Sequence, residues 1–122
     1  MKIYAFICTR TEVLPNYTQK LVSYLSRCKI EVNLLVNKES IFAAYEEAVK
    51  NTPIEDDDIV IFCHDDIEII MDPQQFVTVL IRASRRAQSG FFGPAGTRLL
   101  TQDAMWWNKE VWSAGKHRGF VL

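Results

Sequence analysis

Cysteine is scarce in this sequence, and its spacing excludes the common cysteine frameworks. Cys8, Cys28 and Cys63 are odd in number, form no C-x-x-C motif and lie on or beside apolar runs. Buried free thiols are therefore expected rather than disulfides or zinc ligands. Long apolar runs are also lacking: residues 1–8 are too short for a signal peptide, and no later stretch could span a bilayer. We therefore expect a cytoplasmic protein without a transmembrane segment.

An excess of charge of one sign is absent as well. The formal net charge is -1, and acidic and basic side chains are nearly balanced in both halves of the chain. This balance excludes the basic footprint expected of a protein that binds duplex nucleic acid. The sequence also lacks repeats, low-complexity tracts and a convincing linker, so its 122 residues are expected to form a single domain, 1–122.

What the sequence has is an alternation of strand and helix patterns. Short β-branched or aromatic runs occupy residues 2–8, 30–36, 58–63 and 91–95, and they are apolar at nearly every position. Such runs are typical of parallel strands that are covered on both faces. Helical patterns separate them, so we expect an α/β fold with a mostly parallel, doubly wound sheet and helices on both faces.

The helical patterns have apolar stripes and recognisable ends. The first stripe consists of Leu14, Tyr17, Leu21, Tyr24, Leu25 and Cys28. The second helix can be capped by Ser40, and its apolar residues are Ile41, Ala44, Tyr45, Ala48 and Val49. The third can start at Asp72-Pro73 and end at Gly90, with an inward face of Phe76, Val79, Leu80 and Ala83.

Polar residues follow three of the expected strands at their carboxyl ends, where open parallel sheets bind ligands. These segments are residues 8–12, 37–40 and 64–68. His64-Asp65-Asp66 follows a buried strand directly, and a divalent cation would compensate charge placed there and let carboxylates hold a diphosphate. The alternative is a turn that faces water. Four acids at residues 55–58 precede the same strand and are interpreted as a solvated turn, because that edge has no binding crevice.

Four segments in order carry a family resemblance: residues 7–10 (ICTR), 40–45 (SIFAAY), 62–69 (FCHDDIEI) and 93–98 (GPAGTR). The chain resembles a family 2 glycosyltransferase of GT-A type, and more narrowly the streptomycin-biosynthesis-like branch. The resemblance implies a Rossmann-like nucleotide-sugar-binding domain, with a donor-binding core at 1–98 and a partial acceptor-side segment at 99–122. It implies a metal-assisted transferase whose partners are a nucleoside-diphosphate sugar and a carbohydrate or other hydroxyl acceptor.

The resemblance also implies roles for individual residues. The donor-binding positions are Thr9, Arg10, Glu12, Asn37, Tyr45, Asp65, Gly96 and Thr97. The metal positions are Asp66 and His64, for Mn²⁺ or Mg²⁺, with histidine standing where the family's D-x-D motif has its first acid. In a second departure, Glu46 stands where the pattern suggests asparagine, so either Glu46 turns to solvent or donor binding is weakened.

The carboxyl-terminal part contains no group that can be assigned as the catalytic base. Asp103 and Glu110 are the only acids beyond the fourth expected strand, so the sequence supports donor binding better than complete catalysis. Three tryptophans in this part could stack on a sugar ring, pack in the core or form a contact in a homo-oligomer: Trp106, Trp107 and Trp112. The alternative functions are a catalytically incomplete nucleotide-sugar-binding or assembly module, and a flavodoxin-like or receiver-like regulatory domain.

Overall fold

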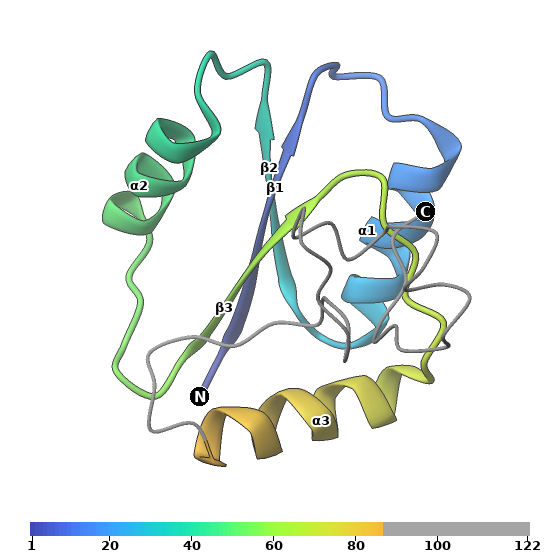
Figure 1. The fold of residues 1–122 in the computed structure, drawn as a ribbon, viewed down its shortest axis with the longest axis vertical. Helices are drawn as coiled ribbons and strands as arrows, with labels where there is room; N and C mark the ends of the chain where they lie inside the picture. Colours follow the sequence, from blue (N-terminus) through green and yellow to red (C-terminus); the bar gives the residue numbers. More distant parts are fainter. Residues whose placement is uncertain (87–122) are drawn as a thin grey trace, which may run out of the picture. The chain divides into compact units, whose positions relative to one another are not determined.

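The computed structural model describes residues 1–86, which form alternating strands and helices (Figure 1). The elements are β1 (Ile3–Thr9), α1 (Asn16–Arg27), β2 (Glu31–Val36), α2 (Ile41–Asn51), β3 (Ile59–His64) and α3 (Pro73–Arg86). The three strands and three helices expected in this part of the chain are confirmed. The expected strand at 91–95 and the helix end at Gly90 lie outside the described residues.

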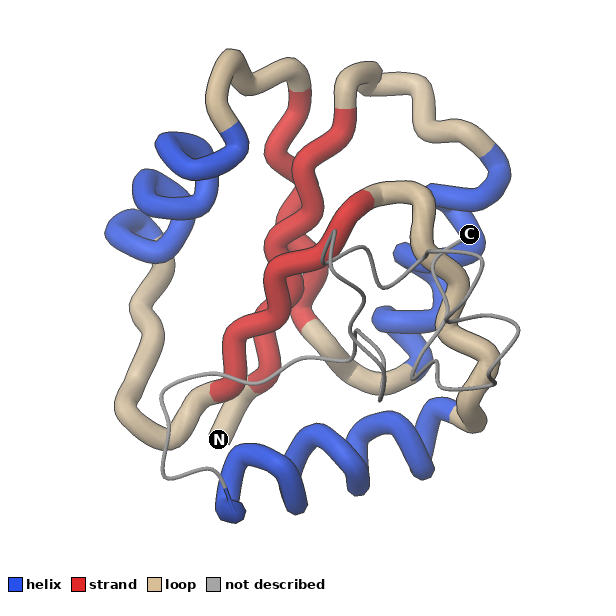
Figure 2. The backbone as a smooth tube through the Cα atoms, in the orientation of Figure 1, coloured by secondary structure: helices blue, strands red, loops and turns tan. Residues whose placement is uncertain are grey.

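The strands form a parallel sheet in the order β2-β1-β3, with β1 in the centre. The connection from β1 to β2 through α1 moves toward one side edge of the sheet, and the connection from β2 to β3 through α2 moves back toward the other. Because such connections are right-handed, α1 and α2 lie on opposite faces of the sheet. Figures 1 and 2 show α2 on one side of the sheet and α1 and α3 on the other. The expected α/β fold, with a parallel sheet covered on both faces, is therefore confirmed.

The main core lies between the sheet and the helices α1 and α3. Ala5 and Ile7 of β1 are fully buried there together with Leu25 of α1. Tyr24 of α1 meets Phe76 of α3 edge to face, with ring centroids 5.8 Å apart. Further side chains of α3 pack on this core, namely Val77, Leu80 and Ile81. Removing these apolar surfaces from water is the main force that holds the two helices against the sheet.

The inward faces of α1 and α3 differ from the expected stripes at two positions. In α1, Thr18 is fully buried and Tyr17 is 51% exposed, because Thr18 continues the series of Leu21, Leu25 and Cys28 at spacings of three and four residues. In α3, the pair 76–77 and the pair 80–81 lie one turn apart and face the core together. Val79 falls on the other side of this stripe and is 48% exposed.

The expected starts of α2 and α3 are confirmed. The Ser40 hydroxyl accepts a hydrogen bond from the backbone N–H of Ala43 at 3.3 Å. At the start of α3, the Asp72 carboxylate accepts from the N–H of Gln74 at 3.1 Å, and Pro73 is the first helical residue. These bonds satisfy first-turn amides that have no partner within the helix. None of the helices in residues 1–86 is long and apolar enough to cross a membrane.

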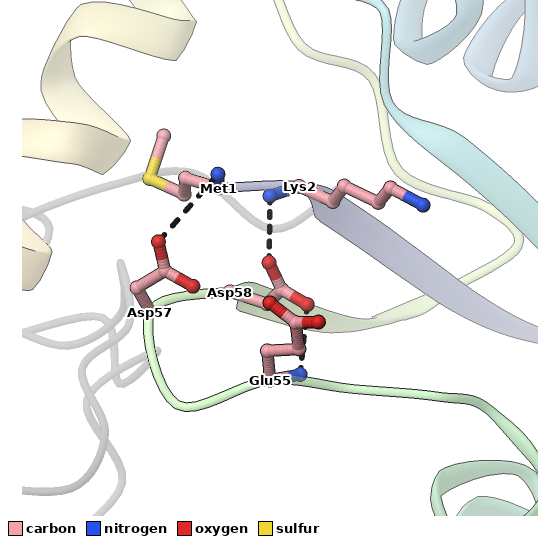
Figure 3. A network of polar contacts seen from close by, with 5 residues as sticks. All are labelled: Met1, Lys2, Glu55, Asp57 and Asp58. Carbon is pink, nitrogen blue, oxygen red and sulfur yellow. Dashed lines mark hydrogen bonds and ion pairs between the residues drawn. The ribbon is translucent and has the colours of Figure 1, made fainter.

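The acidic run at residues 55–58 lies at the amino ends of β1 and β3. Asp58 accepts hydrogen bonds from the backbone N–H of Lys2 at 2.7 Å and of Glu55 at 2.9 Å (Figure 3). These two bonds, the one from Glu55 first, lower the pKa of Asp58 below its usual value. Asp57 lies 3.5 Å from the amino-terminal nitrogen. Residues 55–57 are thus exposed as expected, whereas Asp58 is half-buried and joins the starts of two strands.

Candidate functional site

The carboxyl ends of β1 and β2 are joined by a backbone hydrogen bond. The N–H of Asn37 donates to the carbonyl oxygen of Thr9 at 2.8 Å, one residue beyond the last pair of the register, Thr9 and Val36. Asn37 has a φ of 51°, in the left-handed region that asparagine tolerates better than most residues. The chain therefore turns at Asn37, and the two expected donor-binding positions Thr9 and Asn37 are neighbours at this edge of the sheet.

The end of β3 brings the His64-Asp65-Asp66 triplet to the same edge of the sheet. His64 is paired with Cys8 in the register of β1 and β3, and a turn follows at residues 65–66. His64 and Asp66 are exposed, whereas Asp65 between them is half-buried. The two expected metal positions thus face solvent on either side of a residue that is held within the fold.

Asp65 is fixed through its backbone by a residue that the sequence analysis missed. The Thr18 hydroxyl of α1 donates to the carbonyl oxygen of Asp65 at 2.9 Å, and Thr18 is fully buried. A buried polar group without a partner is costly, so this bond satisfies both Thr18 and the Asp65 carbonyl. The available signal was a threonine at a helical spacing from Leu14, Leu21 and Leu25, which placed a hydroxyl on the core side of α1.

Tyr45 reaches the end of β3 from the other face of the sheet. Its hydroxyl donates to the carbonyl oxygen of Cys63 at 3.4 Å, and its ring lies 4.8 Å from that of Phe62. Phe62 in turn stacks on Phe6 of β1 at 5.9 Å. Burial, with smaller contributions from the neighbouring Cys8 and Cys63, raises the pKa of Tyr45 to about 12. Tyr45 therefore remains a neutral hydroxyl at physiological pH, with its ring in an aromatic cluster.

The remaining polar residues near this edge are exposed. Arg10 and Glu12 lie in the segment between β1 and α1, where the Thr11 hydroxyl donates to the Val13 carbonyl at 2.8 Å. Glu46 also faces solvent, and its carboxylate pairs with Lys50 at 3.0 Å one helical turn further on. Of the two alternatives for Glu46, the structure has the one in which the side chain turns to solvent.

Asp66 and His64 are the residues at this edge that would hold a divalent cation. Across residues 1–86, no group of three or more His, Cys, Asp or Glu side chains is arranged to hold a metal ion. Mg²⁺ in phosphate-binding sites is usually held by one or two carboxylates, and water and phosphate oxygens supply its other ligands. Asp66 supplies one such carboxylate, and phosphate oxygens and water would have to supply most of the other ligands. Gly96 and Thr97, expected near the sugar, lie outside the described residues.

Comparison with known proteins assigns the chain to a family. A family model described as "Glycosyltransferase like family" matches residues 15–119. The chain belongs to this glycosyltransferase-like family. The match covers the expected site positions from Asn37 onward and begins after Thr9, Arg10 and Glu12. No curated protein and no solved structure matches the chain.

Membership of the glycosyltransferase-like family supports a role in glycosyl transfer and implies a sugar donor and an acceptor as partners. The parallel sheet of residues 1–86 is consistent with a Rossmann-like GT-A fragment. The strand edge described above is the part of this fold where nucleotide ligands bind in open α/β sheets. This general property of open α/β sheets makes the edge the candidate site.

Proposed function

We propose that this chain binds a nucleoside-diphosphate sugar at the carboxyl edge of its sheet and takes part in metal-assisted transfer of the sugar to a hydroxyl acceptor. Thr9, Arg10 and Asn37 lie on the nucleotide side of this proposal, and His64 and Asp66 on the diphosphate side. The narrower resemblance to the streptomycin-biosynthesis-like branch belongs to the same proposal. The proposal also includes a cytoplasmic location, where thiols such as those of Cys28 and Cys63 stay reduced.

One observation carries this proposal: in a member of the glycosyltransferase-like family, the ends of β1, β2 and β3 meet at one edge with His64 and Asp66 exposed. The Asn37 to Thr9 bond holds the first two ends together. The Thr18 to Asp65 bond holds the third end against α1. A ligand that spans this edge would thus meet a backbone that is already ordered, which lowers the entropy cost of binding.

The protein groups at this edge have distinct tasks in the proposed reaction. Asp66 and His64 provide an anionic oxygen and an imidazole nitrogen for a divalent cation, which would neutralise charge on the departing diphosphate. Arg10 is exposed beside the end of β1 and offers several N–H donors to phosphate oxygens. The three residues act by electrostatics and orientation, and none is proposed as a nucleophile.

Titration calorimetry with a panel of nucleoside diphosphates, each with and without Mn²⁺, tests the proposal. We expect at least one member, among UDP, GDP, ADP, CDP and dTDP, to bind more tightly when Mn²⁺ is present. Incubation of the matching nucleotide sugars with an acceptor panel then separates transfer from binding alone. If none of the diphosphates bound with or without Mn²⁺, donor binding at this edge would be rejected. Binding without transfer would favour the alternative of a nucleotide-sugar-binding module.

A further inference from the structure

Two side-chain hydroxyls contact the backbone on either side of His64. Thr18 of α1 donates to the carbonyl of Asp65, the residue after His64, at 2.9 Å. Tyr45 of α2 donates to the carbonyl of Cys63, the residue before it, at 3.4 Å. Figure 1 shows α1 and α2 on opposite sides of the sheet, so these two contacts reach the end of β3 from both faces.

The Thr18 contact differs from the usual behaviour of a threonine within a helix. Such hydroxyls commonly donate to a carbonyl one turn earlier in their own helix. Thr78 of α3 does so, with a bond of 2.9 Å to the carbonyl of Gln74. Thr18 instead donates across 47 positions of sequence to Asp65, and it is fully buried. Its hydroxyl therefore links a helix to the candidate site.

The Tyr45 contact is weaker but comes from a constrained side chain. A separation of 3.4 Å is long for an O–H···O bond, so the hydroxyl alone contributes little. The ring, however, packs on Phe62, and Phe62 stacks on Phe6 of the central strand. This aromatic series holds the Tyr45 hydroxyl beside β3 just before the strand ends.

We infer that Thr18 and Tyr45 are positioning residues, which hold the peptide units around His64 so that His64 and Asp66 face a shared ligand. This inference rests on the proposed function. It adds Thr18 to the site and gives Tyr45, a donor-binding position implied by the resemblance, a role through the backbone and not by contact with the metal or the diphosphate. The Thr18 contact is the stronger of the two, because it is shorter and its donor is completely enclosed. Asp65 thereby serves the site through its backbone carbonyl.

Replacing Thr18 by valine tests the stronger contact, because valine has a similar shape but no hydroxyl. In Thr18→Val, the affinity for the Mn²⁺-bound diphosphate identified by the panel should fall by about 10-fold, as when other residues that orient metal ligands are removed. Affinity for the same diphosphate without Mn²⁺ should stay near the wild-type value. Thr18→Ser, which restores a hydroxyl, should recover most of the metal-dependent affinity.

Two matched substitutions serve as controls. Thr78→Val removes a threonine hydroxyl with an equally short bond to a carbonyl, but in α3, so it should leave the metal-dependent affinity unchanged. Tyr45→Phe should lower that affinity by a smaller factor than Thr18→Val. Tyr24→Phe, which removes a tyrosine hydroxyl that donates to the carbonyl of Met71, is its control.

The outcomes separate this inference from the proposed function. If the wild-type chain binds no diphosphate with or without Mn²⁺, the proposed function fails and the inference fails with it. If it binds a diphosphate equally well with and without Mn²⁺, the inference fails while donor binding stands. If the wild type binds and Thr18→Val keeps its full metal-dependent affinity, only the inference is overturned. Equal losses with and without Mn²⁺ would also overturn it, since they indicate general damage to the fold. If Thr18→Val does not fold, Tyr45→Phe still decides: a loss confined to the metal-dependent affinity supports the inference, and an unchanged affinity overturns it.

Discussion

Asn37 closes the edge of the sheet by donating its backbone N–H to the carbonyl of Thr9 at 2.8 Å while its own φ is 51°. The backbone at this position therefore has a left-handed conformation, and its amide is already used within the fold. The side chain of Asn37 is exposed and remains available to a ligand. Backbone and side chain can be tested separately.

Asn37→Gly should keep the stability of the fold, because glycine adopts a positive φ without a steric penalty. Asn37→Val should destabilise the chain by about 1–2 kcal/mol, because a β-branched side chain cannot make the local hydrogen bonds that let asparagine adopt a left-handed conformation and is more crowded there. Urea denaturation followed by circular dichroism measures the stability of both variants. A fall in diphosphate affinity in Asn37→Gly, at unchanged stability, would assign the side chain to the ligand. Equal stability of the two variants would contradict the φ argument.

Asp66→Ala should reduce the Mn²⁺-dependent affinity for the diphosphate by about 10-fold or more, equivalent to at least about 1.4 kcal/mol. The reason is that Asp66 is the exposed carboxylate at the carboxyl end of β3, next to the proposed diphosphate position. Asp56→Ala removes an exposed acid at the opposite end of the same strand and is the matched control. Calorimetry in the presence of Mn²⁺ compares them. Similar losses in both variants would mean that net charge, and not position on the strand, controls binding.

The stability of the chain should decrease in acid through Asp58. Its folded-state pKa is lowered by hydrogen bonds from the N–H groups of Glu55 and Lys2, so its contribution is present above the usual value of 3.8 and is lost as pH falls through the lower, folded-state pKa. Asp58→Asn should be less stable than wild type at pH 7, because an amide has one acceptor oxygen in place of two. The difference in stability between Asp58→Asn and the wild type should become smaller near pH 3, because protonation of Asp58 then removes part of its contribution in the wild type.

Urea midpoints at pH 7 and pH 3 measure this effect, with Asp56→Asn as a control that changes the same charge at an exposed neighbour. The urea midpoint of Asp56→Asn should remain close to that of the wild type at both pH 7 and pH 3. A gap between Asp58→Asn and wild type that stayed constant from pH 7 to pH 3 would show that protonation of Asp58 is not linked to folding.

Cys63 should react slowly with thiol reagents in the folded chain. Burial raises the pKa of its thiol to about 11, and the thiolate is the reactive form. At pH 8 its alkylation by iodoacetamide should be about two orders of magnitude slower than that of an unperturbed cysteine with a pKa of about 8.5. Mass spectrometry of tryptic peptides follows the reaction, and unfolding in urea should abolish the protection. Rapid alkylation in the native chain would show that the end of β3 opens readily.

The helix starts were predictable because they depend on local chemistry. Ser40 and Asp72 cap amides within three residues of themselves, so the sequence alone contains both partners of each bond. The parallel strands were predictable for a related reason, since continuous apolar runs that alternate with helices can be buried on both faces only in such a sheet. The position of His64-Asp65-Asp66 at a strand end followed directly from the strand boundary.

The contacts that shape the site were not predictable, because they join distant parts of the chain. The partners Thr18 and Asp65 are 47 positions apart, and Tyr45 and Cys63 are 18 apart. Nothing local to Thr18 shows whether its hydroxyl bonds to a carbonyl one helical turn earlier or to the turn that follows β3, and both choices satisfy the donor. Even the rotation of α1 that buries Thr18 in place of Tyr17 depends on which side chains fit against the sheet.

By itself, then, the sequence determined the order of strands and helices, their local ends and the strand end that carries the acidic triplet, since these depend on apolar periodicity and neighbouring residues. Only the tertiary structure decided which face of each helix is buried, that Asn37 closes onto Thr9, and that hydroxyls from opposite faces contact the backbone around His64. The physical reason is that packing selects among several locally equivalent hydrogen-bond partners, and that selection is made by the whole fold at once.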